Sequence, residues 1–148
     1  MITNKYAYFD YKIESELEAG IALIGDEVKA VRSNRVNLKG AYAKIFYNSK
    51  NNPEVFLVGS HFHSETVDPY RTRKLLLKKI EIERLIGKTS EKGLTLLPLK
   101  MYFKKGLVKV LLGLGKGKKK FDKREALRKR DAMQRINISL KQKTYRDE

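Results

Sequence analysis

The sequence contains no cysteine, and this absence excludes both a disulfide framework and any metal site built on thiolates. The absence agrees with a reducing compartment. No run of apolar residues approaches the roughly 20 that a membrane-spanning helix needs, and the first residues, MITNKYAYFDY, lack the apolar core of a secretory signal. We therefore expect a cytoplasmic protein that has no membrane partner.

Histidine is nearly absent as well, with two in the chain. His61 and His63 are two residues apart, a spacing that would place both side chains on the same face of a strand and suits a pair of metal ligands. A zinc site takes three or four protein ligands, and the sequence offers neither a cysteine nor a third histidine to complete one. We therefore predict no metal site and no cofactor.

Negative charge is scarce relative to positive charge. The chain of 148 residues holds 33 Lys and Arg against 17 Asp and Glu, which gives a net charge of +16 at pH 7 and an isoelectric point of about 10.0. A balance this basic is typical of proteins that bind nucleic acid or an anionic membrane surface. The length, with 41% hydrophobic residues, is enough for one domain with a hydrophobic core.

Half of the excess positive charge lies in residues 116–148, which hold thirteen Lys and Arg against five Asp and Glu. The densest part is KGKKKFDKREALRKR, from Lys116 to Arg130. Cations fixed along one segment displace the counterions that condense on nucleic-acid phosphates, and Phe121 among them is suited to stacking on a base. A solvated tail that only aids solubility is the alternative interpretation.

A mostly apolar stripe at helical spacing begins within this basic stretch. An isolated helix with charge of a single sign at its start, and with no core to pack against, is marginal. We therefore expect the tail to be disordered when free and helical when bound, as segments that fold on binding are. The stripe consists of Ala126, Lys129, Met133, Ile136 and Leu140.

The clearest strand pattern runs from Tyr11 to Leu23. Its odd positions are mostly apolar and its first four even positions are charged, which predicts a long strand with one buried face. Gly20 is a natural place for a bend or bulge. Two interpretations of the acidic face are open: an exposed face that discourages association, or a carboxylate that accepts hydrogen bonds from base amino groups or 2′-hydroxyls.

A short helix and a hairpin are predicted next. The string GDEVKAVRSN predicts a helix of two turns that Asp26 caps. Residues 41–47 and 54–62 are β-rich runs on either side of the loop NSKNNP, which together predict a hairpin.

A second hairpin is predicted near the end of the apolar part of the chain. Residues 94–103 and 107–114 alternate again, and the compact turn between them has Gly106 available for a positive φ. Pro98 interrupts the first of these strands and favours an edge position or a bulge.

The remaining segment, RTRKLLLKKIEIERLIGKTSEKG, follows Pro69 and is predicted to be helical, with Gly87 and Gly93 as stops. Five strands with a helical segment between the third and the fourth is the order of an OB-type barrel. We therefore predict a mainly β fold with short helices. Residues 1–115 would form an OB-type antiparallel barrel of five to six strands with flanking helices, and residues 116–148 the basic tail.

Nearly the whole chain is covered by the strings EAGIAL with GDEVKAVR (residues 18–32), VNLKGAYA (36–43), DPYRTRKLLL (68–77), LIGKTSEKGLTLLPLKMYFKKG (85–106) and KGKKKFDKRE (116–125). In order and spacing these strings resemble the small protein B (SmpB) family, the tmRNA-binding partners of bacterial ribosome rescue. The resemblance implies an RNA-binding protein of trans-translation that is not an enzyme.

The family resemblance also implies the partners. The barrel would bind the tRNA-like domain of tmRNA, and the tail would enter the decoding centre and the empty mRNA channel of the small subunit of the 70S ribosome. Elongation factor Tu is an expected partner through alanyl-tmRNA. Two other interpretations remain open. One is a general OB-fold RNA-binding or ribosome-associated protein that binds unstructured strands through exposed aromatics. The other is an RNA-processing enzyme, for which the sequence offers no reacting constellation.

Carried onto this sequence, the tmRNA-binding residues of the family are Asn4, Glu18, Leu76 and, as a looser match, Lys109. The resemblance makes Glu18 an acceptor for a base or a sugar. In the tail, an aromatic that is usually His or Tyr is Phe here, which can stack but can neither hydrogen bond nor titrate. The ribosome-binding residues implied for the tail are Gly117, Lys118, Lys119, Phe121, Asp122, Lys123, Arg124, Arg128, Lys129 and Arg130.

Two glycines depart from the family's pattern just before the tail. Gly113 and Gly115 stand where family members often have Ala. This departure suggests a looser hinge between the barrel and the tail.

Overall fold

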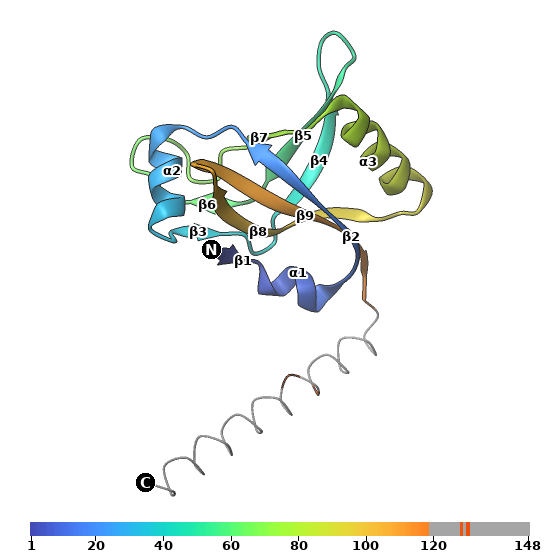
Figure 1. The fold of residues 1–148 in the computed structure, drawn as a ribbon, viewed down its shortest axis with the longest axis horizontal. Helices are drawn as coiled ribbons and strands as arrows, with labels where there is room; N and C mark the ends of the chain where they lie inside the picture. Colours follow the sequence, from blue (N-terminus) through green and yellow to red (C-terminus); the bar gives the residue numbers. More distant parts are fainter. Residues whose placement is uncertain (119–127, 129, 131–148) are drawn as a thin grey trace, which may run out of the picture. The chain divides into compact units, whose positions relative to one another are not determined.

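Antiparallel strands are the main secondary structure of the computed structural model, which describes residues 1–118, 128 and 130 (Figure 1). The helices are α1 (Lys5–Asp10), α2 (Gly25–Arg32) and α3 (Lys79–Glu91). The strands are β1 (Ile2–Thr3), β2 (Tyr11–Ile21), β3 (Val36–Asn37), β4 (Tyr42–Tyr47), β5 (Pro53–Val58), β6 (His61–Phe62), β7 (Arg73–Leu76), β8 (Thr95–Lys104) and β9 (Leu107–Gly117).

The large sheet has seven strands in the order β1-β8-β9-β2-β7-β5-β4, and β3 pairs with β6 in a small second sheet. Strand β4, at one end of the large sheet, also contacts β8, so the sheet curls around the core. The predicted mainly β, antiparallel fold with short helices is confirmed. The predicted five to six strands fit the longer members of the large sheet, to which the two-residue β1 adds at the edge of β8.

The long first strand is confirmed, but its irregularity is not where the sequence placed it. Along β2 the charged side chains of Lys12 and Glu14 are exposed, while Ala19 and Ile21 are buried. The register with β9 shifts between Ile13 and Ser15, whereas Gly20 pairs regularly on both sides. Gly20 is therefore not needed for a bend. Its missing side chain instead allows β7 to lie close to β2.

The C-terminal hairpin is also confirmed. Lys105 and Gly106 both have positive φ, 51° and 77°, as a two-residue turn between twisted strands requires. The register of β8 with β9 shifts between Pro98 and Lys100, which confirms the bulge that the proline favoured.

The segment RTRKLLL is not helical, contrary to prediction. It forms β7, which pairs with β2 on one side and with β5 on the other. Arg73 and Leu75 are buried while Lys74 and Leu76 are exposed, so the period is two and the run of leucines concealed it. Helix α3 begins only at Lys79.

Two other predicted boundaries are also wrong. Helix α3 continues through Gly87 and ends at Glu91, and only Gly93, with φ of 63°, acts as a stop. The run 54–62 is not one strand, because Gly59 has φ of 79° and turns the chain; β6 beyond it pairs with β3 instead of β4.

Asp26 does not cap α2. The N-cap residue is Ile24, whose backbone N–H donates to Oε1 of Glu27 at 3.0 Å. The carboxylate of Asp26 instead accepts hydrogen bonds from the hydroxyls of Ser64 and Thr66, so it fixes the loop before β7 onto the helix.

The glycines before the tail do not form a hinge. Gly113 and Gly115 are buried within paired strand β9. A Cβ on Gly113 would lie 2.6 Å from Cδ1 of Leu99, and one on Gly115 would lie 3.0 Å from Cβ of Tyr11. Both glycines therefore allow the close packing seen here, and the strand continues past them to Gly117.

The chain divides into a unit of Met1–Gly117 and a second unit of Lys118–Glu148. Within the second unit, Arg128 and Arg130 are helical and exposed. The predicted disorder and binding-induced helix of the tail concern residues that are mostly outside the described part of the chain.

Candidate nucleic-acid interface

Three of the four residues that the family resemblance assigned to tmRNA lie on one face of the large sheet. Glu18 is on β2, Leu76 on β7 and Lys109 on β9. Gly20 of β2 pairs with Leu76 on one side and with Lys109 on the other. Because residues two apart on a strand share a face, Glu18 lies on this same outer face, opposite the core.

Leu76 is an apolar side chain held at the surface, with 53% of it exposed. A Cβ built on Gly20 would lie 3.2 Å from Cβ of Leu76, which is tighter than an ordinary contact. The glycine therefore lets β7 approach β2 closely and lets the leucine spread over the strand.

Glu18 is fixed by donors from the neighbouring hairpin. The hydroxyl of Tyr102 donates to Oε2 at 2.5 Å, and Nζ of Lys104 lies 3.3 Å from Oε1. The Tyr102 hydrogen bond, with help from Lys104 and the charge of Lys109, lowers the pKa of Glu18 although partial burial acts in the opposite direction. The same bond is the main cause that raises the pKa of Tyr102 to about 12. At neutral pH the site therefore presents an ionised, oriented acceptor.

Sequence reasoning missed Tyr102 and Lys104 as members of this site. A signal was present, because the two-residue turn at Lys105 and Gly106 fixes the hairpin register and pairs Tyr102 directly with Lys109. The position of β9 beside β2, which brings Tyr102 to Glu18, had no local signal.

Asn4 does not lie on this face. Its side chain is 4% exposed, and all of its polar atoms are used within the protein. Nδ2 donates to the carbonyl oxygens of Leu38 and Pro98 at 3.2 and 2.9 Å, and Oδ1 accepts from the N–H of Ala7 as the cap of α1. The asparagine thus joins the N-terminal segment to β8.

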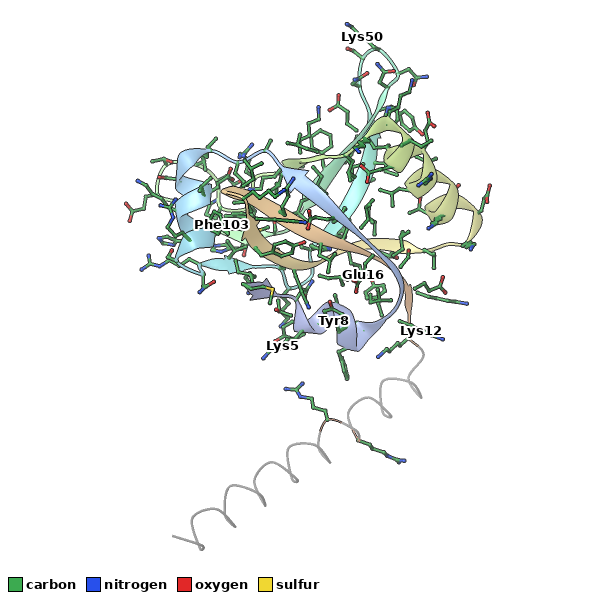
Figure 2. The ribbon with its side chains drawn as sticks, viewed as in Figure 1. Lys5, Tyr8, Lys12, Glu16, Lys50 and Phe103 are labelled. Carbon is green, nitrogen blue, oxygen red and sulfur yellow. The ribbon has the colours of Figure 1, made fainter. Side chains whose placement is uncertain are left out.

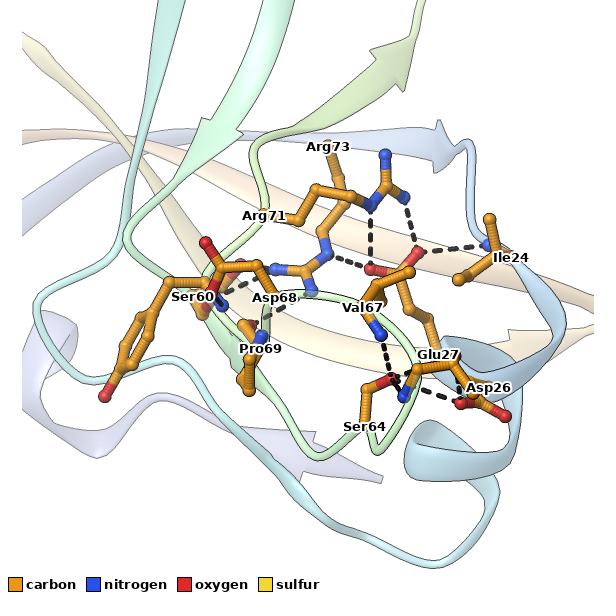
Figure 3. Close-up of polar contacts among 12 residues, drawn as sticks. Ile24, Asp26, Glu27, Ser60, Ser64, Val67, Asp68, Pro69, Arg71 and Arg73 are labelled. Carbon is orange, nitrogen blue, oxygen red and sulfur yellow. Dashed lines mark hydrogen bonds and ion pairs between the residues drawn. The ribbon is translucent and has the colours of Figure 1, made fainter.

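A buried ionic network supports the face from within the core, and Figure 3 shows it. Glu27 of α2 accepts hydrogen bonds from Nε of Arg73 at 2.5 Å and from Arg71. Arg73 also donates to the carbonyl oxygens of Ser60 and Pro69 at 3.1 and 3.0 Å. Burial raises the pKa of Glu27, but the hydrogen bonds from Arg71, from the backbone of Ile24 and from Arg73 outweigh it and leave the pKa below its ordinary value.

The histidine pair and the tail residues can be placed only in part. His61 packs against Tyr70 with ring centroids 5.0 Å apart, and His63 is exposed. The described residues hold no group of three or more His, Cys, Asp or Glu that could bind a metal ion, and no helix among them is long and apolar enough to cross a membrane.

Of the residues assigned to the ribosome-binding tail, Gly117 closes β9 and pairs with Tyr11, and Lys118 follows it directly. Arg128 and Arg130 are helical. The others lie outside the described residues: Lys119, Phe121, Asp122, Lys123, Arg124 and Lys129.

Comparison with known proteins extends this picture to the whole chain. A family model described as SmpB protein matches residues 1–142. An SsrA-binding protein from Caldicellulosiruptor saccharolyticus is 51% identical over 149 residues, which cover 97% of this chain and 90% of the relative. An SsrA-binding protein from Bacillus subtilis (strain 168) is 49% identical over 144 residues, which cover 93% and 89% of the two chains.

A solved structure is similar as well. It is described as "tmRNA-SmpB: a journey to the center of the bacterial ribosome", and its matching chain is 44% identical to this one. The superposition has a TM-score of 0.63 and covers 86% of this chain and 94% of that chain.

Proposed function

The chain belongs to the SmpB family, and from this premise we propose that it is an RNA-binding protein of trans-translation that binds the tRNA-like domain of tmRNA and delivers it to stalled ribosomes. Two comparisons support the proposal. The relatives carry the name SsrA-binding protein, and the similar solved chain is described with tmRNA and the bacterial ribosome.

The observation that carries the proposal is the grouping of Glu18, Leu76 and Lys109 on one outer face of the sheet. Lys109 would lie against a backbone phosphate, and Leu76 would pack on a ribose or a base. Glu18, which is held ionised, would accept a hydrogen bond from a base amino group or a 2′-hydroxyl; the 2′-hydroxyl is the group that distinguishes RNA from DNA.

Asn4 has a supporting place in this proposal. Because its side chain is buried and satisfied by backbone partners, it would position the N-terminal segment instead of contacting RNA.

The basic tail is proposed to act on the ribosome. A tRNA-like RNA without an anticodon arm cannot satisfy the decoding centre, so the protein would supply the missing half. The cationic segment from Lys116 to Arg130 would occupy the decoding centre and the empty mRNA channel, where mRNA would compete for the same phosphate-lined path.

The remaining partners follow from this role. Elongation factor Tu would meet the protein through alanyl-tmRNA, and the protein would act in the cytoplasm. We propose that the chain itself makes or breaks no covalent bond, because peptidyl transfer would belong to the ribosome and the aminoacylated RNA.

The test is equilibrium binding of the full chain to the folded tRNA-like domain of tmRNA and to an unstructured RNA of equal length, across a salt series. Binding to the folded RNA should be tighter and should persist at roughly physiological salt, since it does not rest on phosphate contacts alone. Glu18→Ala should weaken it roughly tenfold, the scale expected for one charge-assisted hydrogen bond.

Glu14→Ala is the matched control, because Glu14 is an exposed glutamate on the same strand. It should leave the affinity within about twofold of the unaltered chain, the range expected of a surface substitution away from the site. Equal affinities for both RNAs that collapse together as salt rises would instead support the general OB-fold RNA-binding protein and would overturn the proposal.

The tail is tested separately by substituting Asp122 to Arg130 with alanine. Binding to the tRNA-like domain should survive, because the barrel is unchanged, while rescue of stalled ribosomes in a reconstituted translation system should fail. Loss of RNA binding together with rescue would contradict the division of roles.

A further inference from the structure

Two phenylalanines lie together on the outer face of β5 and β4, the last two strands in the order of the large sheet. Phe46 is 42% exposed, and its ring meets that of Phe56 edge to face with centroids 5.6 Å apart. Both side chains point away from the core, since Val55 and Leu57 of β5 are the fully buried residues of that strand. The aromatic pair therefore offers an open surface instead of supporting the fold.

A hollow of about 330 Å³ adjoins this pair. Its volume falls in the range of about 300–1,000 Å³ that is usual for small-molecule pockets. Its lining combines three aromatic side chains with a polar rim. The hollow is lined by Phe46, Tyr47, Asn48, Glu54, Phe56 and Thr72.

The polar rim is held in place by the β4–β5 loop, whose tip carries Lys50 (Figure 2). Oδ1 of Asn48 accepts from the backbone N–H groups of Lys50 and Asn52 at 2.9 and 3.0 Å, and its Nδ2 donates to Oε1 of Glu54 at 2.8 Å. The hydrogen bond from Asn48 is the main cause that lowers the pKa of Glu54. Glu54, the cross-strand partner of Phe46, is thus a fixed, ionised acceptor beside the aromatic rings.

Two lysines flank the aromatic pair. Phe56 pairs with Lys44 across β4 and with Lys74 across β7, so a cation stands on either side of it. Nζ of Lys44 lies 5.2 Å from the ring centroid of Phe46, and Nζ of Lys74 lies 3.4 Å from Oε2 of Glu54. Aromatic rings between cations are the arrangement that stacks a base while holding the phosphates beside it.

We propose that this hollow, the Phe46–Phe56 site, binds an unpaired nucleobase of RNA. The base stacks on Phe46, an amino group on its edge donates to Glu54, and the adjoining phosphates lie near Lys44 and Lys74. The inference rests on the proposed function, because the partner is again RNA. The proposed contact lies on a different part of the same sheet from Glu18. Its Lys74 is on β7, two residues before Leu76.

The chain contains no tryptophan, so Phe46→Trp places a single indole fluorophore in the site and keeps a stacking surface. The full-length variant is titrated with a short unstructured RNA and with the same sequence in a duplex. The unpaired RNA should quench the indole, whereas the duplex should not. Tyr70→Trp is the matched control, since Tyr70 is 60% exposed but lies outside the site, and its fluorescence should not respond.

The affinities of two Phe46 variants for unstructured RNA distinguish base stacking on the ring from simple apolar contact. Phe46→Ala should weaken binding of the unstructured RNA roughly 5- to 10-fold, the lower part of the range for one base–aromatic stack. Phe46→Leu keeps the bulk without the ring and should lose as much. The proposal would be overturned if Phe46→Leu bound the unstructured RNA as tightly as the unaltered chain does. It would also be overturned if the duplex quenched the indole of Phe46→Trp as strongly as the unpaired RNA.

Failure of the Phe46–Phe56 site can be distinguished from failure of the proposed Glu18 contact. Glu18→Ala should weaken binding of the folded tRNA-like domain and leave the quenching of Phe46→Trp intact. If the indole does not respond and Phe46→Ala binds both RNAs normally, the Phe46–Phe56 site is refuted even where the Glu18 face holds, and an apolar protein segment becomes the better occupant of the hollow.

Discussion

Two glutamates in this protein are held ionised by neighbouring donors, one inside the core and one on the surface. Glu27 is 0% exposed and accepts from Arg73 and Arg71, while Glu18 on the outer face accepts from Tyr102 and Lys104. Both have a pKa below the ordinary value. The shift alone therefore does not identify a binding residue.

The difference lies in what surrounds the partners. The guanidinium of Arg73 is enclosed, since it donates to Glu27, to Ser60 and to Pro69 and lies 4.1 Å from the ring centroid of Phe62. No oxygen of Glu27 can reach a partner molecule. Through Arg73, Glu27 joins α2 to β7, the strand that also carries Leu76. Glu18 keeps 32% of its side chain exposed, so its carboxylate can accept a further hydrogen bond.

The largest effect should come from breaking the buried pair. Glu27→Ala leaves Arg73 charged and enclosed without its counter-ion, which typically costs about 3–5 kcal/mol. The free energy of unfolding measured in urea should fall by that amount. Glu83→Ala, an exposed glutamate on α3, is the control and should change it by no more than about 0.5 kcal/mol. A loss for Glu27→Ala as small as the control's would mean that solvent reaches the pair.

The pH dependence of stability sharpens the same contrast. Since the pKa of Glu27 is below its ordinary value of 4.5 in the folded chain, its charge stabilises the fold above pH 4.5, and this contribution is lost as the pH falls through the folded value. The gap in unfolding free energy between the unaltered chain and Glu27→Gln should be widest near pH 7 and should close in acid.

The variant comparison matters because Glu18, Asp26 and Glu54 also have lowered pKa values and contribute acid sensitivity to both chains. A gap that stays constant from pH 7 down to about pH 2 would show that the amide replaces the carboxylate without loss of a charge interaction.

The same contrast between buried and exposed residues explains which strands could be predicted from the sequence. Period-two alternation found β2, which has one face in the core and one toward solvent. In β8 and β9 the alternation holds only toward their shared turn, because residues 96–99 and 112–115 are buried on both faces. It failed at β7, where an arginine occupies an inward position and three leucines follow one another. From the sequence alone Arg73 is expected at the surface, because its partner Glu27 is 46 positions away along the chain.

The candidate site was proposed from family resemblance, and physical pattern alone would have indicated only part of it. Glu18 stood among Glu14 and Glu16 with nothing local to distinguish it, and it is singled out by Tyr102, which is 84 positions away. Such long-range partners depend on sheet order, which no local propensity encodes. Asn4 shows where the family resemblance falls short. The resemblance assigned it to RNA contact, but it does not reveal that the side chain is buried.

The smallest effect should come from loosening the exposed glutamate without removing it. Tyr102→Phe deletes the hydroxyl that orients Glu18, so the pKa of Glu18, followed by NMR, should rise toward 4.5. Conversely, Glu18→Gln should return the pKa of Tyr102 from about 12 toward 10.0. Because the carboxylate of Glu18 stays ionised at pH 7 in Tyr102→Phe, affinity for the tRNA-like domain should fall only about two- to threefold, less than for Glu18→Ala. A loss equal to that of Glu18→Ala would mean that the Tyr102 hydroxyl itself contacts RNA, whereas an unchanged affinity with a raised pKa would mean that the orientation of Glu18 is set by the RNA and not by the protein.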